Sequence, residues 1–499
     1  MDSETEGYVG QIEGEEAATE TEPEESRADT GGTDGGGDAE HDRQDKQIDI
    51  EVESDSQRRK LIVALTWPAL AENFLTSIMS MFDMMMVGGL GAYAISAVGI
   101  VTQPKFIMMA AFMAMSVGTT ALVARCKGAR DPEGANLALE QTMVITLAIT
   151  VVLCIAMIFL AEPLIRWIAG NELSEQTIKE GITYFMIQIY GFPTLAFTFA
   201  INAALRGAGN TRASFYNNTV ANIVNVSFNY CLIGGNFGFP RLEVAGASIA
   251  TVIGQFVGLL MALYVVARGK QYIKLSFKKR WKIDLSMIKR IVNIGFPALI
   301  EQVIMRVGML WFTIIVTALG DIPYAAHMVA MNLQQLSFTT GMAFGTASTT
   351  LVGQCLGRKR SDLARVYVKM TQYLGLIVSV IIAVLLFFCG HLLAGMYTSD
   401  MVIIVLAANM LKIIAVSNPV SNARFVYVSA LRGAGDARYM AVITFVGVLL
   451  IRPLMSLLLI NVFHMGLAGV WIALVSDSMI CFLLAMMRYR AGKWEFIKV

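Results

Sequence analysis

Two carboxylates lie in an apolar stretch that is long enough to cross a lipid bilayer. The stretch covers residues 68–91, and the acids are Glu72 and Asp83. An ionisable side chain costs roughly 2.5–3.5 kcal/mol at the centre of a membrane helix, so such residues usually face a polar cavity or a partner. At about 100° per residue, Thr76 and Met79 fall on the same helical stripe as both acids. The pattern therefore predicts a pathway for an ion or a proton along this helix.

The same stretch recurs later in the chain. Residues 297–320 repeat residues 68–91 at a constant offset, and Glu301 takes the place of Glu72. Asp83 falls on Phe312 in the second copy, so the two copies are not equivalent. A repeat built around membrane-buried carboxylates indicates a transporter made of two related halves.

The composition indicates a membrane protein. Of the 499 residues 56% are hydrophobic and 15% are charged, and many apolar runs are long enough to span a bilayer. This argues against a soluble enzyme, and we expect neither catalytic residues nor a cofactor. The six cysteines include no CxxC pair, so we expect no metal site other than a site for Na⁺ at Asp83.

The loops between the apolar runs indicate how the chain is oriented. Lys and Arg gather in every second loop, which places these loops and both chain ends in the cytoplasm of a cell-membrane protein. The run Lys278-Lys279-Arg280 fits this topology signal better than a nucleic-acid patch, so we expect the bilayer and no nucleic acid as a partner. The predicted parts are a disordered acidic tail (1–57), a six-helix bundle (58–267), a basic cytoplasmic linker (268–290), a second six-helix bundle (291–487) and a cytoplasmic tail (488–499).

Further blocks of sequence are also duplicated. GTTALVARCKGA (118–129) matches ASTTLVGQCLGR (347–358), and ALRGAGNTR (204–212) matches ALRGAGDAR (430–438). The glycine-rich blocks have neither the strand nor the GK[ST] ending of a phosphate-binding loop, so we assign their glycines to helix turns. Without an ATP site, transport driven by an ion gradient is favoured.

These blocks over residues 62–487 resemble the multidrug and toxic compound extrusion (MATE) family, and within it the prokaryotic DinF-like branch. The resemblance implies an all-α polytopic membrane protein with twelve transmembrane helices in two pseudo-symmetric six-helix bundles that face each other in a V. It further implies export of small organic, often cationic, compounds by alternating access, driven by entry of Na⁺ or H⁺. Lipid-linked precursor flippases of the same superfamily remain an alternative, and we expect a monomer.

The resemblance also assigns the coupling site. The family branch has an aspartate on helix 1, which Asp83 matches, and an Asn-x-x-x-Asp on helix 5, which reads Asn225-Val-Ser-Phe-Asn229 here. The amide at Asn229 keeps an oxygen ligand but removes a charge and a titrating group. Either Asp83 couples alone with Asn225 and Asn229 as neutral ligands, or Glu72 and Glu301 share the role.

Other polar residues in the spans stay open between function and structure. Glu72 and Glu301 could instead be locked to basic residues, and we expect Asp477 to pair with an arginine of the second half. Contact with substrate and a polar seam are equally compatible with the residues of helix 8. The candidates for the substrate cavity are Met79, His327, Asn332 and Gln334.

Overall fold

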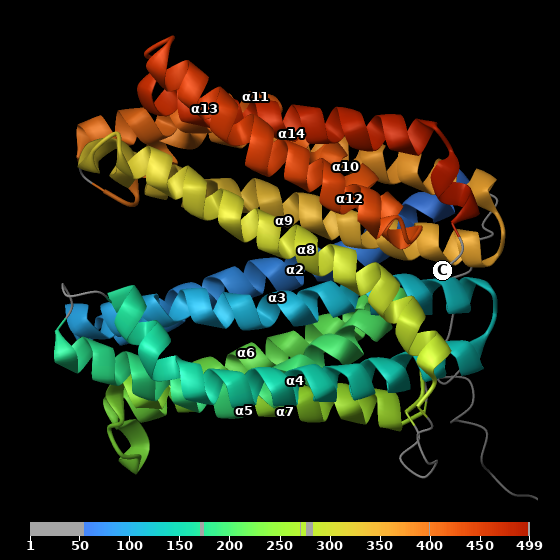
Figure 1. Cartoon of the computed structure of the whole chain (residues 1–499), viewed down its shortest axis with the longest axis horizontal. Helices are drawn as coiled ribbons and strands as arrows, with labels where there is room; N and C mark the ends of the chain where they lie inside the picture. Colours follow the sequence, from blue (N-terminus) through green and yellow to red (C-terminus); the bar gives the residue numbers. More distant parts are fainter. Residues whose placement is uncertain (1–53, 170–173, 270, 276–282, 399, 498–499) are drawn as a thin grey trace, which may run out of the picture. The chain divides into compact units, whose positions relative to one another are not determined.

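The computed structural model describes residues 54–169, 174–269, 271–275, 283–398 and 400–497. The acidic tail up to residue 53 and the run Lys278-Lys279-Arg280 lie outside the described residues. Within the described part, long helices follow one another with short connections, and the helices of each half lie together (Figure 1). The all-α prediction is therefore confirmed for this part of the chain.

The helices fall into two sets of six when α12, η2 and α13 are taken as one. The first set is α2 (Asp55–Gly88), α3 (Ala92–Gly128), α4 (Pro132–Ala169), α5 (Glu175–Gly207), α6 (Thr211–Gly234) and, after a short turn η1 (Asn236–Gly238), α7 (Glu243–Ala267). The second set is α8 (Leu285–Thr317), α9 (Asp321–Gly357), α10 (Ser361–Gly395), α11 (Met401–Gly433), α12 (Ala437–Thr444) with the π-helix η2 (Phe445–Ile451) and α13 (Arg452–Asn461), and α14 (Gly466–Arg490), followed by η3 (Lys493–Phe496).

Ten of these helices are long and apolar enough to cross a membrane, judged by length and composition over the described residues. The remaining two long helices are α6 and α9, which carry more polar side chains. Five asparagines lie on α6 alone. A helix that keeps polar residues at membrane depth must bury them against protein or a polar cavity, so α6 is a natural place for a site.

Helix ends differ from the predicted spans where a cap or a glycine fixes them. The α8 helix begins at Leu285, inside the residues predicted as linker, because the carboxylate of Asp284 accepts hydrogen bonds from the backbone N–H groups of Ser286 and Met287 at 2.8 and 3.0 Å. In the two ALRGAG blocks, Gly209 and Gly435 have φ of 82° and 89°, which glycine adopts without strain. The assignment of these blocks to helix turns is confirmed.

The two halves meet closely at the end of α3 and α9. A Cβ atom on Gly128 would lie 1.9 Å from the backbone oxygen of Gln354, and one on Gly357 would lie 2.1 Å from that of Arg125. The Gln354 side chain also donates to the backbone oxygen of Gly207 at 3.2 Å. These glycines belong to duplicated blocks, so the repeat itself supplies the contact between the halves.

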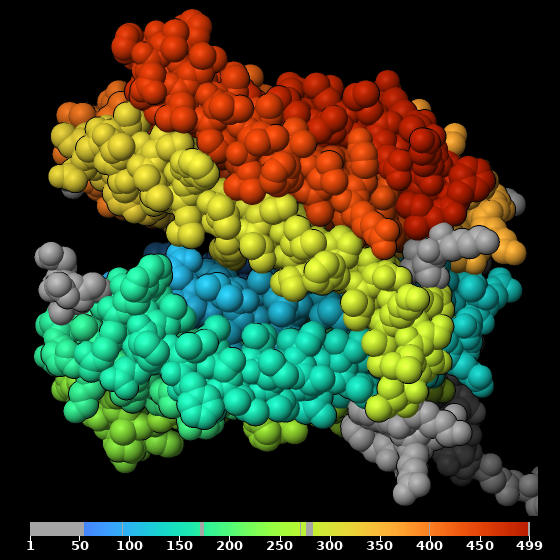
Figure 2. Space-filling model, in the orientation of Figure 1, coloured from blue at the N-terminus to red at the C-terminus, as the bar shows by residue number. Residues whose placement is uncertain are grey.

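The α8 helix and the end of the chain add further contacts between the halves. Figure 2 shows α8 in yellow, crossing this face between α4 and α14, and α8 also packs against α3. After α14, Trp494 is buried and stacks on Tyr489 with ring centroids 5.0 Å apart. Arg125 of α3 donates to the backbone oxygen of Ile497 at 2.8 Å. The end of the predicted cytoplasmic tail is thus an ordered strap that reaches from the second half to the first.

Candidate functional site

The α2 and α6 helices pack together along a row of polar pairs. Asn218 pairs with Glu72, Asn222 with Thr76 and Asn229 with Asp83, and the partners are 146 residues apart in each pair. A constant separation means that the two helices run in the same direction with fixed register. We call this row the amide seam. It consists of Glu72, Thr76 and Asp83 on α2 and Asn218, Asn222, Asn225 and Asn229 on α6.

At one end of the amide seam, polar side chains surround Asp83. The Nδ2 atom of Asn229 donates to Asp83 Oδ1 at 2.6 Å. The hydrogen-bonding pattern orients Asn225 so that its nitrogen donates to both oxygens of Asp83, at 3.0 and 3.1 Å, while its oxygen accepts from the backbone N and Oγ1 of Thr251, both at 3.2 Å. The structure therefore brings together all three residues that the resemblance assigned to coupling and adds Thr251 of α7.

One oxygen atom in this cluster has no hydrogen-bond partner. Oδ1 of Asn229 is buried and unpaired within the described part of the chain, although Nδ2 of the same amide is bonded to Asp83. Several other buried polar atoms of the described chain are also without a partner, but this one lies beside a carboxylate, where it is available to a further ligand. Hard cations prefer oxygen ligands, so Asp83, Asn229 and Thr251 are the residues here that would hold Na⁺.

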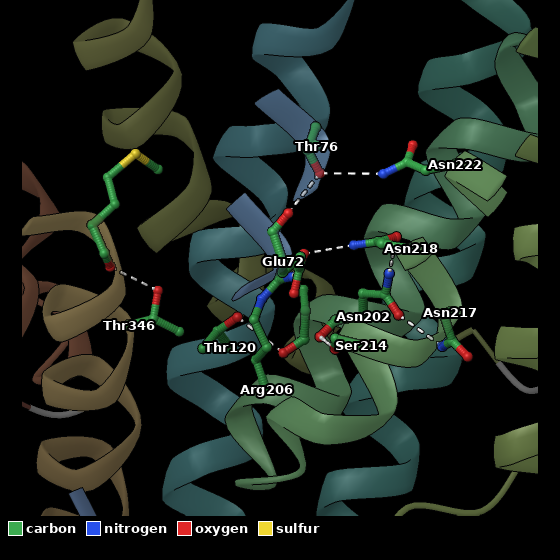
Figure 3. Close-up of polar contacts among 12 residues, drawn as sticks. Glu72, Thr76, Thr120, Asn202, Arg206, Ser214, Asn217, Asn218, Asn222 and Thr346 are labelled. Atoms are coloured by element: carbon green, nitrogen blue, oxygen red, sulfur yellow. Dashed lines mark hydrogen bonds and ion pairs between the residues drawn. The ribbon is translucent and has the colours of Figure 1, made fainter. Parts of the chain in front are cut away.

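Glu72 is the centre of the other end of the seam, shown in Figure 3. Asn218 donates to its carboxylate at 2.6 Å, and the guanidinium of Arg206 lies 3.8 Å away. Asn202 donates to Asn218 at 3.1 Å, and Asn217 in turn donates to Asn202 at 3.1 Å. Glu72 is thus held through a chain of amides from α5 and α6, in which the amide contact is shorter than the ionic one.

Glu301 has the equivalent place in the second half but a different environment. It forms an ion pair with Arg432 and accepts from Oγ1 of Thr444 at 3.2 Å. Arg206 and Arg432 are the arginines of the two ALRGAG blocks. The sequence left open whether the two glutamates are functional or locked to basic residues, and in the structure each glutamate lies beside an arginine. Both arginines lie at helix ends, from where a side chain of this length can reach into the bundle.

The residues predicted for the substrate cavity lie on two different helices. Met79 lies on the same stripe of α2 as Asp83, one turn away, whereas His327, Asn332 and Gln334 lie on α9. His327 is buried on α9 among aromatic rings, with centroids 5.3 Å from Phe312 and 5.6 Å from Trp471. Asn332 is exposed and donates to a backbone oxygen of its own helix, while Gln334 is half-buried. A role for these residues in substrate binding stays a prediction.

Asp477 has the arginine partners that were predicted for it. It is fully buried on α14, where it pairs with Arg452 and lies 3.7 Å from Arg424. The guanidinium of Arg452 also lies 5.5 Å from the ring of Phe312, the residue that takes the place of Asp83 in the repeat. In the second half, the place of Asp83 is therefore taken by an aromatic ring that lies beside the arginine paired with Asp477.

Known proteins match both the sequence and the fold. A probable multidrug resistance protein NorM of Thermotoga maritima is 29% identical over 440 residues, which cover 88% of this chain and 93% of that protein. A protein of the same name from Acinetobacter baylyi is 29% identical over 443 residues, with 86% and 96% covered.

Solved structures agree at the level of the fold. One described as the outward-facing conformation of a multidrug resistance MATE family transporter of the MOP superfamily superposes with a TM-score of 0.82 at 21% identity, over 90% of this chain and 99% of that one. A MOP superfamily transporter from Pyrococcus furiosus gives 0.82 at 20% identity, over 91% and 99%. The family model MatE matches residues 68–231 and 297–458. Because that model covers the greater part of the chain and both halves, the chain belongs to the MATE family of transporters.

Proposed function

We propose that this protein exports small organic compounds across the cell membrane in exchange for Na⁺ or H⁺, and that the ion binds at Asp83. One observation carries the proposal: two amides of α6 hold the carboxylate of Asp83 while one of them, Asn229, keeps a buried oxygen without a partner. The relatives named multidrug resistance proteins support export of drugs. We further propose that the protein acts as a monomer, because one chain supplies both halves.

The contacts of Asp83 suggest how an ion would be sensed. Three N–H···O contacts from the amides stabilise the ionised carboxylate when no cation is bound. A cation needs oxygen ligands and a proton removes the negative charge, so either event weakens these contacts or requires an amide to turn. The amides belong to α6 and the carboxylate to α2. Binding of the ion therefore changes how these two helices hold each other.

Pro68 lets α2 respond to this change. Proline has no N–H group, so it interrupts the hydrogen-bond ladder within α2 and allows the helix to bend there. Coupling requires that the ion favour one conformation, because an ion with equal affinity for both would shift nothing. The close contact of α3 and α9 marks the end of the halves that is closed in this structure. We propose that this end and both termini face the cytoplasm, which makes the conformation outward-facing.

Transport by the purified protein in liposomes tests the proposal. Ethidium or a fluoroquinolone is followed under an imposed Na⁺ gradient or an imposed pH gradient, for the wild type, Asp83→Asn and the matched control Phe312→Leu. We expect one gradient to drive transport, Asp83→Asn to abolish it and Phe312→Leu to retain it. Full transport by Asp83→Asn would refute the assignment of the site. If neither gradient moves either compound while fluorescent lipids cross the bilayer, the flippase alternative holds instead.

A further inference from the structure

A groove lies between the first turns of α2 and the start of α6. Its volume is about 730 Å³, and its wall includes Arg59, Lys60, Val63, Trp67 and Arg212. The three cationic side chains are exposed, and none of them has an ion pair within the described part of the chain. Asp55 also lines the groove, but its carboxylate is paired with Arg58 at 3.0 Å. The groove therefore carries a net positive charge that its own walls do not neutralise.

The position of the groove along α2 places it at the membrane surface. The apolar span begins directly after Lys60, so the cations flank the hydrocarbon core at the level of lipid headgroups. Trp67 follows seven residues later, about 10 Å further along the helix axis, and is 67% exposed. Exposed tryptophan is typical of the zone between headgroups and acyl chains. One wall thus offers charge at headgroup depth and an apolar surface just below it.

We propose that this groove binds an anionic phospholipid, with its phosphate among Arg59, Lys60 and Arg212 and an acyl chain along Val63 and Trp67. Basic pockets beside membrane helices are a recognised site for anionic headgroups. An organic cation would be repelled by three positive charges. A free phosphate ion would leave the apolar part of the groove without a partner. The proposal does not depend on the function proposed for Asp83.

The second half lacks part of this arrangement, although it repeats the same helices. Arg59 and Trp67 fall on Ile288 and Phe296 at the constant offset of the repeat. The site is therefore expected once per chain. Because Pro68 also lines the groove, a lipid bound there touches α2 at the proline that interrupts its hydrogen-bond ladder and contacts α6 through Arg212.

Binding of lipid by the full-length protein in neutral detergent tests the proposal. Phosphatidylglycerol, phosphatidylcholine and water-soluble glycerol phosphate are titrated, and bound molecules are counted by native mass spectrometry alongside the thermal unfolding midpoint. The test variant is Arg59→Gln with Lys60→Gln and Arg212→Gln. Each cationic side chain contributes at most about tenfold to the affinity for an anionic lipid. We therefore expect the triple variant to bind phosphatidylglycerol on the order of a hundredfold more weakly than the wild type.

A matched control removes the same charge outside the groove. Lys289, Lys359 and Arg438 are exposed and lie at the same end of the helices, so their replacement by Gln should leave the affinity within about twofold. Equal loss in both triple variants would overturn the proposal, because general charge would then explain binding. Glycerol phosphate that binds as tightly as the lipid would also overturn it. Trp67→Ala, which keeps all charges, should weaken binding of the lipid and not of glycerol phosphate, and it provides a second test if the triple variant fails to fold.

Discussion

The amide seam and its counterpart in the second half occupy matched positions of one repeat and hold different side chains. Glu72 and Glu301 match, and each glutamate lies beside the arginine of its own ALRGAG block. Beyond Glu72, the first half has amide side chains and then Asp83. At matched positions beyond Glu301, the second half has Val448 and Phe312. The shared part fixes a helix to its bundle, and the part that differs contains the site that we propose for the ion.

The comparison also separates carboxylates that form an ion pair with an arginine from one that does not. Asp477 is fully buried between two arginines, and Glu301 is paired directly with Arg432. Asp83 forms hydrogen bonds with neutral amides instead, although Lys105 of α3 also acts on it electrostatically. Asn229 stands where the family branch has a second acid, so Asp83 is the one carboxylate at this end of the amide seam, and its hydrogen-bond donors are neutral.

The largest expected effect is on stability in the second half. Arg432→Gln leaves Glu301, whose side chain is only 6% exposed, without its cation, and breaking a buried pair costs up to about 3–5 kcal/mol. Arg206→Gln should cost about 1 kcal/mol, because Glu72 is 16% exposed and keeps Asn218 at 2.6 Å. Thermal and denaturant unfolding in detergent, followed by tryptophan fluorescence, measures both. Equal losses would show that the two glutamates are held in the same way.

The next effect is on transport in the first half. Asn229→Leu removes a hydrogen bond to a charged group, which is worth about 1.5–3 kcal/mol, so we expect ion-driven transport to fall by about ten- to a hundredfold. Met455→Leu is the control, since Met455 follows Arg432 at the distance at which Asn229 follows Arg206. Transport by Met455→Leu should stay within about twofold of the wild-type rate. Initial rates of uptake into liposomes at equal protein content provide the measurement, and a comparable fall in the control would remove the difference between the halves.

A smaller difference is expected one step along the seam. Asn218→Ala removes the nearest donor to Glu72 and should destabilise the protein by about 1–2 kcal/mol. Thr444→Ala should cost about half as much, because Arg432 remains on Glu301. Unfolding curves of the two variants under identical conditions decide the order. The reverse order would mean that Arg206 at 3.8 Å holds Glu72 more firmly than the amide does.

The smallest effect is expected at Asn222. Its amide is 3.4 Å from Oγ1 of Thr76 and its surroundings are exposed, so Asn222→Ala should change stability by no more than about 0.5 kcal/mol. Transport should also remain within about twofold. If this variant lost transport as severely as Asn229→Leu, the whole seam, and not its Asp83 end, would be the functional unit.

Much of the fold could be predicted from the sequence, because each membrane helix is marked by its own run of apolar residues. Apolar runs of sufficient length and matched blocks predicted the helices and their duplication, and Asp83 stood out as an acid where acids are costly. The ends of the helices were harder to predict, since hydropathy marks only the apolar part of each helix. Ser361–Gly395, for example, extends well before the apolar residues that signal it.

The partners within the site were harder to predict because they depend on which helices are neighbours. Asn218 and Asn222 carry no charge, and they matter only once α6 lies parallel to α2. Thr251 has no sequence signal of its own. Arg206 and Arg432 were read as markers of topology, although their side chains also reach the glutamates. Spacing within a helix is visible in sequence, and pairing between helices is not.

The strap at the end of the chain has a consequence for biosynthesis. Arg125 is made early and must remain without its Ile497 contact until residue 497 has been made and has left the ribosome. Domains generally fold in the order of their synthesis, so the helices of the first half can assemble long before this contact forms. A product cut short after α14 would keep its membrane helices and lose the buried Trp494 together with the link to α3. The contact with α3 therefore depends on a segment that is made after the last membrane helix.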